Sequence, residues 1–250
     1  MIRNHHYSCV LKTGSMCICL LVHTMVSATA CLAGLAAPEN RHLAGIIAKM
    51  KADYAIVRDY QMEVEIKVYH EGKVAETEQF LYTFRKPDHI RIDMESPYKG
   101  MVLVYRGENG GVAVKPGGLF GFLTLHLSPD SSLLRNAAGQ RIDQTDLGLL
   151  IQNIEHSLTD KRRGVIKVSE LDRQLHIEVM AEDHFLRGVL TLYHFLIDKT
   201  RLLPTEVSEF TPDGIIKREV RFRNLRTSIN APESFFRIGG ETDENAQPAR

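Results

Sequence analysis

The sequence lacks an excess of charge of either sign. Its 31 lysines and arginines are balanced by 31 aspartates and glutamates, so the formal net charge at pH 7 is zero. Nucleic-acid binding is driven by basic side chains that neutralise phosphates, so this balance speaks against a nucleic-acid partner. The hydrophobic, charged and aromatic fractions are 44%, 25% and 7%. These values exclude collagen-like, disordered and polytopic membrane classes.

Cysteine is absent beyond residue 31. Of the four cysteines, Cys9, Cys17 and Cys19 lie within the first 30 residues, and Cys31 follows directly. The body of the chain therefore has no disulfide, no cysteine-ligated zinc and no thiol nucleophile. Its stability must come from a hydrophobic core, which a chain of about 200 residues can supply.

The hydrophobic run near the N-terminus is short. Residues 16–26 are apolar apart from His23 and Thr24, and they fall well below the roughly 20 residues that span a bilayer. Basic residues precede this run, and the small residues Ala28-Thr29-Ala30 follow it. We predict that residues 1–30 are a signal peptide and that the protein is exported to the periplasm.

The same stretch also fits a weak lipobox, because Ala30 directly precedes Cys31. A strong lipobox carries leucine or valine where Ala28 stands. We favour simple cleavage, and the alternative is a lipid anchor at Cys31 that holds the protein to a membrane. Residues 239–250 are predicted to be a disordered tail, which leaves residues 31–238 as one domain.

The sequence beyond the predicted signal peptide indicates a helix followed by many strands. Residues 39–58 have a helical period, and a period of two starts at Tyr60. Regular alternation of apolar and polar residues predicts antiparallel strands with one apolar face and one solvent-exposed face. Strands are expected at residues 60–69, 79–85, 90–95, 101–106, 112–115, 165–171, 174–181, 188–198, 203–210 and 215–227, and a second helix at 145–158. Residues 116–141 are expected to form a long loop.

These elements predict an α+β fold of one strongly curved antiparallel sheet, a half-open β-barrel of about ten strands. The two helices are expected on its concave face. A curved sheet has more concave area than two helices cover, so we expect an apolar cavity that the helices do not fill.

Several motifs resemble a bacterial family catalogued as domain of unknown function 1571. They are Ser96-Pro97-Tyr98-Lys99-Gly100, Val114-Lys115-Pro116-Gly117-Gly118, Leu127-Ser128-Pro129-Asp130 and Thr145-Asp146-Leu147-Gly148. Later motifs, Leu203-Pro204, Asp213-Gly214 and Ala231-Pro232-Glu233-Ser234-Phe235-Phe236, are similar to the second half of periplasmic lipoprotein carriers of the LolA/LolB type. The resemblance covers about residues 42–238. It implies a half-open barrel closed by helices, with an apolar cavity for acyl chains, and it assigns no catalytic residue. The loop at 116–141 is a departure from the carriers.

Groups that could carry chemistry are few. His126, Ser128 and Asp130 lie on one segment, where side chains do not converge as a catalytic triad must. His176 and Glu178 alternate on one expected strand, but a metal site needs three or four converging ligands. We therefore predict no catalytic residue, no metal site and no cofactor.

Arg218 falls on the apolar side of its expected strand. It either reaches solvent at the hairpin end along its aliphatic stem, or it lies in the cavity and hydrogen-bonds a loop or a ligand. The predicted ligand-binding residues are Met62, Val64, Ile66, Phe80, Tyr82, Phe84, Ile90, Ile92, Met94, Leu119, Phe120, Phe122 and Arg218.

The hypothesis from sequence is a non-enzymatic envelope protein that binds lipid acyl chains or a lipidated protein, with a role in transport. Leu119, Phe120, Phe122 and the helix at 145–158 would gate the cavity, and a membrane surface is a further partner. One alternative is an envelope sensor or protein-interaction module on the same fold. The least favoured alternative is a hydrolase built on His126 or His184.

Overall fold

The computed structural model describes residues 38–107, 110–137, 139–160, 164 and 166–238. The predicted signal peptide, Cys31 and the predicted tail at 239–250 lie outside the described residues. Within them the structure has two α-helices and eleven strands. The elements are α1 (Pro38–Ala55), β1 (Asp59–His70), β2 (Lys73–Arg85), β3 (His89–Ser96), β4 (Val102–Arg106), β5 (Gly111–Lys115), β6 (Leu125–Leu127), α2 (Leu147–Thr159), β7 (Ile166–Glu170), β8 (Gln174–Glu182), β9 (Leu190–Asp198), β10 (Pro204–Phe210) and β11 (Ile216–Thr227).

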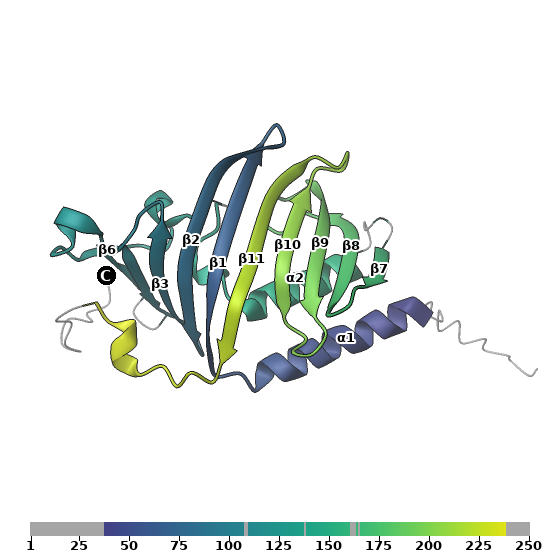
Figure 1. The fold of residues 1–250 in the computed structure, drawn as a ribbon, viewed down its shortest axis with the longest axis horizontal. Coiled ribbons are helices and arrows are strands. Elements are labelled where there is room, and N and C mark those ends of the chain that lie inside the picture. The colour runs from purple at the N-terminus through teal and green to yellow at the C-terminus, as the bar shows by residue number, and fades with distance from the viewer. Residues whose placement is uncertain (1–37, 108–109, 138, 161–163, 165, 239–250) are drawn as a thin grey trace, which may run out of the picture. The chain divides into compact units, whose positions relative to one another are not determined.

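All eleven strands belong to one antiparallel sheet, in the order β6-β5-β4-β3-β2-β1-β11-β10-β9-β8-β7. Two meanders, β1 to β6 and β7 to β11, are joined where the first strand pairs with the last (Figure 1). The sheet is curved and not closed, since β6 and β7 form its two edges. The predicted α+β half-barrel is confirmed.

Alternation along the strands gives the sheet its buried inner face. On β1, Met62, Val64 and Ile66 are buried, whereas Glu63 between them is exposed. These residues join the inner side chains of β2 to β5 in one core cluster. A second cluster combines α1, α2 and the inner faces of β8 to β10. The inner face of the sheet is therefore the main apolar surface of the domain.

Helix α2 crosses the inner face of the sheet, behind β10 and β11 in Figure 1. It begins at Asp146, whose carboxylate accepts hydrogen bonds from the N–H groups of Gly148 and Leu149 at 2.7 and 3.1 Å, as an N-cap residue does. Its apolar side buries Leu147, Ile151 and Ile154, and α1 packs against α2 within the second cluster. Neither α1 nor α2, the α-helices of the described ranges, is long and apolar enough to cross a membrane.

The segment between β5 and α2 is more ordered than the predicted loop. It contains the three-residue strand β6 and the 3₁₀ turns Gly118–Phe120, Ser132–Leu134 and Ile142–Gln144. β6 accounts for the eleventh strand, which the alternation did not reveal because three partly exposed residues are too few to show a period. We call residues 116–137 and 139–145 the lid segment.

Candidate functional site

A small cavity lies between the inner face of the sheet, α2 and the lid segment. Its volume is about 70 Å³. It is lined by Met62, Val64, Ile66, Phe80, Tyr82, Asn136, Gln140, Gln144, Thr145, Asp146, Leu150, Asn153, His184, Phe185, Val207, Glu209, Arg218, Val220 and Phe222. The floor of the cavity is apolar and belongs to the strands. Its polar rim is formed by the lid segment, α2, the β8–β9 loop and the strand residues Glu209 and Arg218.

The predicted ligand-binding residues fall into three groups. Six line this cavity: Met62, Val64, Ile66, Phe80, Tyr82 and Arg218. Four are buried in the same core cluster beside it without lining it: Phe84, Ile90, Ile92 and Met94. Three lie on the lid segment with exposed side chains and do not line the cavity: Leu119, Phe120 and Phe122.

The expectation of a hollow that the protein's own elements leave unfilled is wrong for this conformation. Ligand pockets occupy about 300–1,000 Å³, whereas this cavity has about 70 Å³, enough for a few water molecules. The reason is that the lid segment adds to the two helices: Leu134 and Ile142 are buried in the core cluster of the concave face, together with Leu147 of α2. The lid segment would have to move before an acyl chain could enter.

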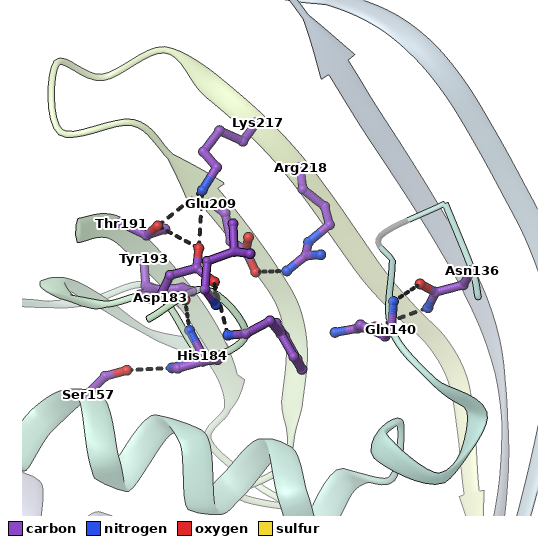
Figure 2. A network of polar contacts seen from close by, with 12 residues as sticks. Asn136, Gln140, Ser157, Asp183, His184, Thr191, Tyr193, Glu209, Lys217 and Arg218 are labelled. Atoms are coloured by element: carbon purple, nitrogen blue, oxygen red, sulfur yellow. Dashed lines mark hydrogen bonds and ion pairs between the residues drawn. The ribbon is translucent and has the colours of Figure 1, made fainter. Parts of the chain in front are cut away.

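Arg218 lies inside the rim of the cavity rather than at the solvent-exposed hairpin end. Its guanidinium donates a hydrogen bond to Glu209, its direct cross-strand partner on β10, and both side chains are buried (Figure 2). Burial raises the pKa of Glu209, although the charge of Arg218 opposes that shift. The sequence placed Arg218 on the apolar side, but Glu209 was not recognised as its partner.

A second polar group adjoins this pair. The Asp183 carboxylate accepts hydrogen bonds from Thr191 Oγ1 at 2.8 Å and from Lys217 Nζ at 3.2 Å (Figure 2). Burial would raise the pKa of Asp183, but the hydrogen bonds from Phe185 N–H, Thr191 and Lys217 outweigh it and lower the pKa. This group fixes the β8–β9 loop that carries His184 and Phe185 into the cavity wall.

His184 is a titratable group of the cavity wall whose pKa lies well below its ordinary value. Its Nε2 lies 2.7 Å from Ser157 Oγ on α2, and its ring stacks on Tyr193 with centroids 4.2 Å apart. Burial lowers the pKa of His184 to about 4, with a smaller opposing effect from the charge of Asp183. His184 is thus a neutral, packed connection between the loop and α2.

Ser157 and His184 do not form an accessible nucleophile. Ser157 is fully buried and also donates a hydrogen bond to the Asn153 carbonyl. The Asp183 carboxylate is bound by Thr191 and Lys217 rather than by the ring of His184. His126 is an exposed residue of β6, and the nearby Asp130 is paired with Arg141. Within the described residues, neither histidine has the aligned nucleophile and orienting carboxylate of a hydrolase.

The start of α2 is held to the sheet by the hydroxyl groups of two tyrosines, a role that the sequence did not indicate. Tyr60 Oη accepts a hydrogen bond from Leu147 N–H at 2.9 Å, and Thr145 Oγ1 lies 3.3 Å from Tyr82 Oη. Burial raises the pKa of both phenols. Both were expected as apolar strand residues, because alternation does not show which hydroxyl meets a helix end.

The lid segment is attached to the sheet by a side-chain hydrogen bond. Glu78 on β2 accepts one from Ala137 N–H at 3.0 Å, and burial raises the pKa of Glu78 although this bond opposes it. Within the lid, Asn136 and Gln140 bond to each other opposite Arg218 (Figure 2). Gly139 between them has a φ of +75°, a conformation that favours glycine.

Replacing Glu78 with alanine is expected to release the lid segment locally. A hydrogen bond to a charged group contributes about 1.5–3 kcal/mol, so amide hydrogen exchange around Ala137 should accelerate by about tenfold or more. Hydrogen-exchange mass spectrometry over residues 131–141 measures the change. Glu76→Ala, an exposed neighbour on the same strand, is the matched control, and equal exchange in both variants would contradict the attachment.

A larger hollow of about 760 Å³ lies at the ends of β1, β10 and β11. Its lining includes Gln61 and Glu63, which alternate with Met62 and Val64 and therefore point away from the inner face. Arg201, Asn224 and Arg226 also line it. This hollow is open, and its polar and charged side chains alternate with apolar ones such as Leu81 and Leu203.

The sequence matches no protein-family profile and no curated protein. Among solved structures, a conserved uncharacterized protein from Thermus thermophilus is similar, with 9% identity over 84% of this chain and 99% of that chain and a TM-score of 0.48. The lipoprotein LppX from Mycobacterium tuberculosis is similar with 9% identity, 77% and 99% coverage and a TM-score of 0.42. A LolA superfamily protein from Nitrosomonas europaea is similar with 9% identity, 78% and 97% coverage and a TM-score of 0.36. Membership of the domain of unknown function 1571 family stays a prediction.

Proposed function

We propose that this protein is a non-enzymatic envelope protein that binds acyl chains, of a lipid or of a lipidated protein, under its lid segment. The observation that carries the proposal is the apolar floor of the cavity, where Met62, Val64, Ile66 and Phe80 face α2 and the lid segment. Burying an acyl chain contributes about 0.8 kcal/mol per methylene. Such a ligand needs neither a cofactor nor a catalytic group.

Binding requires the lid segment to exchange its own apolar side chains for those of the ligand. Leu134 and Ile142 occupy part of the concave face, and their departure would create the space that the small cavity lacks. The lost burial of these two side chains is replaced by burial of the ligand. The pair Arg218–Glu209 at the rim supplies polar groups for a ligand headgroup or carbonyl.

The outer side of the lid segment fits contact with a membrane surface. Leu119 is 90% exposed, and Phe122 and Leu133 are each 81% exposed. Apolar side chains gathered on one exposed segment mark an interaction site rather than an ordinary surface. Export by a signal peptide at residues 1–30, with or without lipidation of Cys31, would place this segment beside the envelope membranes.

Filling the cavity should weaken ligand binding. Val220 lines the cavity, and Val220→Phe would displace two or three methylenes, a loss of about 2 kcal/mol or more than tenfold in affinity. Fluorescent palmitate titrated into the purified chain measures this, together with native mass spectrometry for co-purified lipid. Val102→Phe is the matched control, because Val102 is equally half-buried but packs near Phe236 on the other face. Palmitate binding that is absent, or equal in the two variants, would refute the proposal.

The alternative is a protein-interaction module or sensor. One observation favours it: the open hollow beside Gln61, Arg201 and Arg226, whose lining combines charged and apolar side chains. This hollow needs no lid movement to admit a peptide or loop. Protein that is purified gently and is always free of lipid, and that loses a bound partner on Arg226→Glu, would favour the module over the carrier.

A further inference from the structure

Three potential metal ligands meet on the outer face of the sheet, away from the cavity. His176 and Glu178 lie on β8, and His194 lies on β9. Their ligand atoms, one from each residue, all lie within 4.8 Å of one another. All three side chains are half-buried, so they are accessible to a dissolved ion and yet restricted in the positions they can take.

The register of two neighbouring strands brings these residues together. His176 and Glu178 are two positions apart on one strand and therefore share a face. His194 is the direct cross-strand partner of Glu178. The alternating residues Ile177 and Phe195 are buried in the core, which fixes the three polar side chains on the opposite side. The sequence predicted no metal site because it showed only two ligands, His176 and Glu178, that share a face. The pairing of β8 with β9 brings a third, His194, beside them.

We propose that His176, Glu178 and His194 bind a divalent transition-metal ion of the zinc class. Two imidazole nitrogens and one carboxylate oxygen are ligands that such ions prefer, and three protein ligands leave a coordination position open to solvent or to a further ligand. Bonds of about 2.0–2.2 Å would bring the ligand atoms to about 3.3 Å from one another. The three side chains would move inward by roughly an ångström or less to reach that spacing.

The neighbouring side chains support a cation at this position. Lys167 on β7 already places its ammonium 3.2 Å from Glu178 Oε1. Because the Lys167 side chain is 66% exposed, it can leave for solvent when an ion arrives. The ring of His194 packs against Phe210 with centroids 4.6 Å apart, and the rings of His176 and His194 lie 5.0 Å apart. Phe210 thus holds one imidazole beside the other.

Cobalt(II) and zinc(II) titrations of the full chain without an affinity tag test the site. We expect one equivalent of Co²⁺ bound with visible d–d absorption but without the sulfur-to-metal charge transfer that thiolates would give. Zinc should displace the cobalt and raise the Tm of the protein. This spectrum separates the proposed site from binding by the four cysteines of the full chain, Cys9, Cys17, Cys19 and Cys31.

Glu178→Gln and His194→Ala are each expected to weaken binding of both ions by at least about tenfold, since even residues that only orient ligands contribute that much. Glu178→Gln is nearly isosteric and keeps the fold testable. His70→Ala, at an exposed histidine of the β1–β2 hairpin, is the matched control and should bind like the wild type. Two results would overturn the proposal. One is that no Co²⁺ binds, or that it binds only with thiolate charge-transfer absorption. The other is that all variants bind the ions with equal affinity.

Discussion

Replacing Arg218 with alanine is expected to lower the free energy of unfolding by about 3–5 kcal/mol. The arginine is the cross-strand partner of Glu209, and both side chains are buried at the rim of the cavity. Removing one partner leaves a carboxylate in a place where charge is poorly solvated, and that cost exceeds the loss of the pair itself. Urea denaturation followed by circular dichroism measures the change in midpoint at constant slope.

The double variant Arg218→Met, Glu209→Leu is the control for this prediction. Replacing both charges by apolar groups of similar volume should recover most of the lost stability, because no uncompensated charge stays behind. The destabilisation of Arg218→Ala should also shrink as pH falls, since burial already raises the pKa of Glu209 and protonation removes its charge. A single variant as stable as the wild type would show that Glu209 is solvated in solution.

Acid should destabilise the folded domain through His184. The pKa of this imidazole is lowered by burial from 6.5 to about 4, so the unfolded chain binds a proton at a pH where the folded chain does not. Stability from this group is therefore fully present above pH 6.5 and declines as the pH falls toward 4. A shift of this size corresponds to at most about 3 kcal/mol.

The free energy of unfolding measured at several pH values between about 7 and 4 tests this sign and size. The wild type should lose stability more steeply than His184→Gln, whose side chain can still hydrogen-bond Ser157 but does not titrate. Asp183, Arg218 and His156 surround the ring, and they are common to both proteins, so the difference between the curves reports His184. His70→Gln should follow the wild-type curve, and parallel curves for the wild type and His184→Gln would refute the prediction.

Local sequence patterns predicted ten of the eleven strands. Tyr60, Met62 and Val64 alternate with polar residues because one face of β1 is buried, and the next two strands alternate in the same way. The other seven were expected from apolar runs bounded by turn residues. Helix α2 could also be predicted, because its buried residues recur at helical spacing. β6 was missed, since its side chains are not sorted into a buried and an exposed face.

Only some of the residues that line the cavity could be predicted from the sequence. Arg218 stood out because it breaks the apolar register of its strand, and the structure places it in the cavity rim. Glu209 carried no such signal. It is a direct partner of Arg218 through the pairing of β10 with β11, and this register depends on the turn and the neighbouring strands rather than on the residues around Glu209.

The order of residues along the chain was enough to show which face of each element is apolar. From this followed the antiparallel strands, the two helices and the curved sheet. The folded chain was needed to show that β1 pairs with β11, that His194 lies beside His176 and Glu178, and that the lid segment closes the hollow to about 70 Å³. Periodicity records the environment of each side chain along one element. Pairing and closure are contacts between elements distant in the chain, and their energies are summed over the whole packed core.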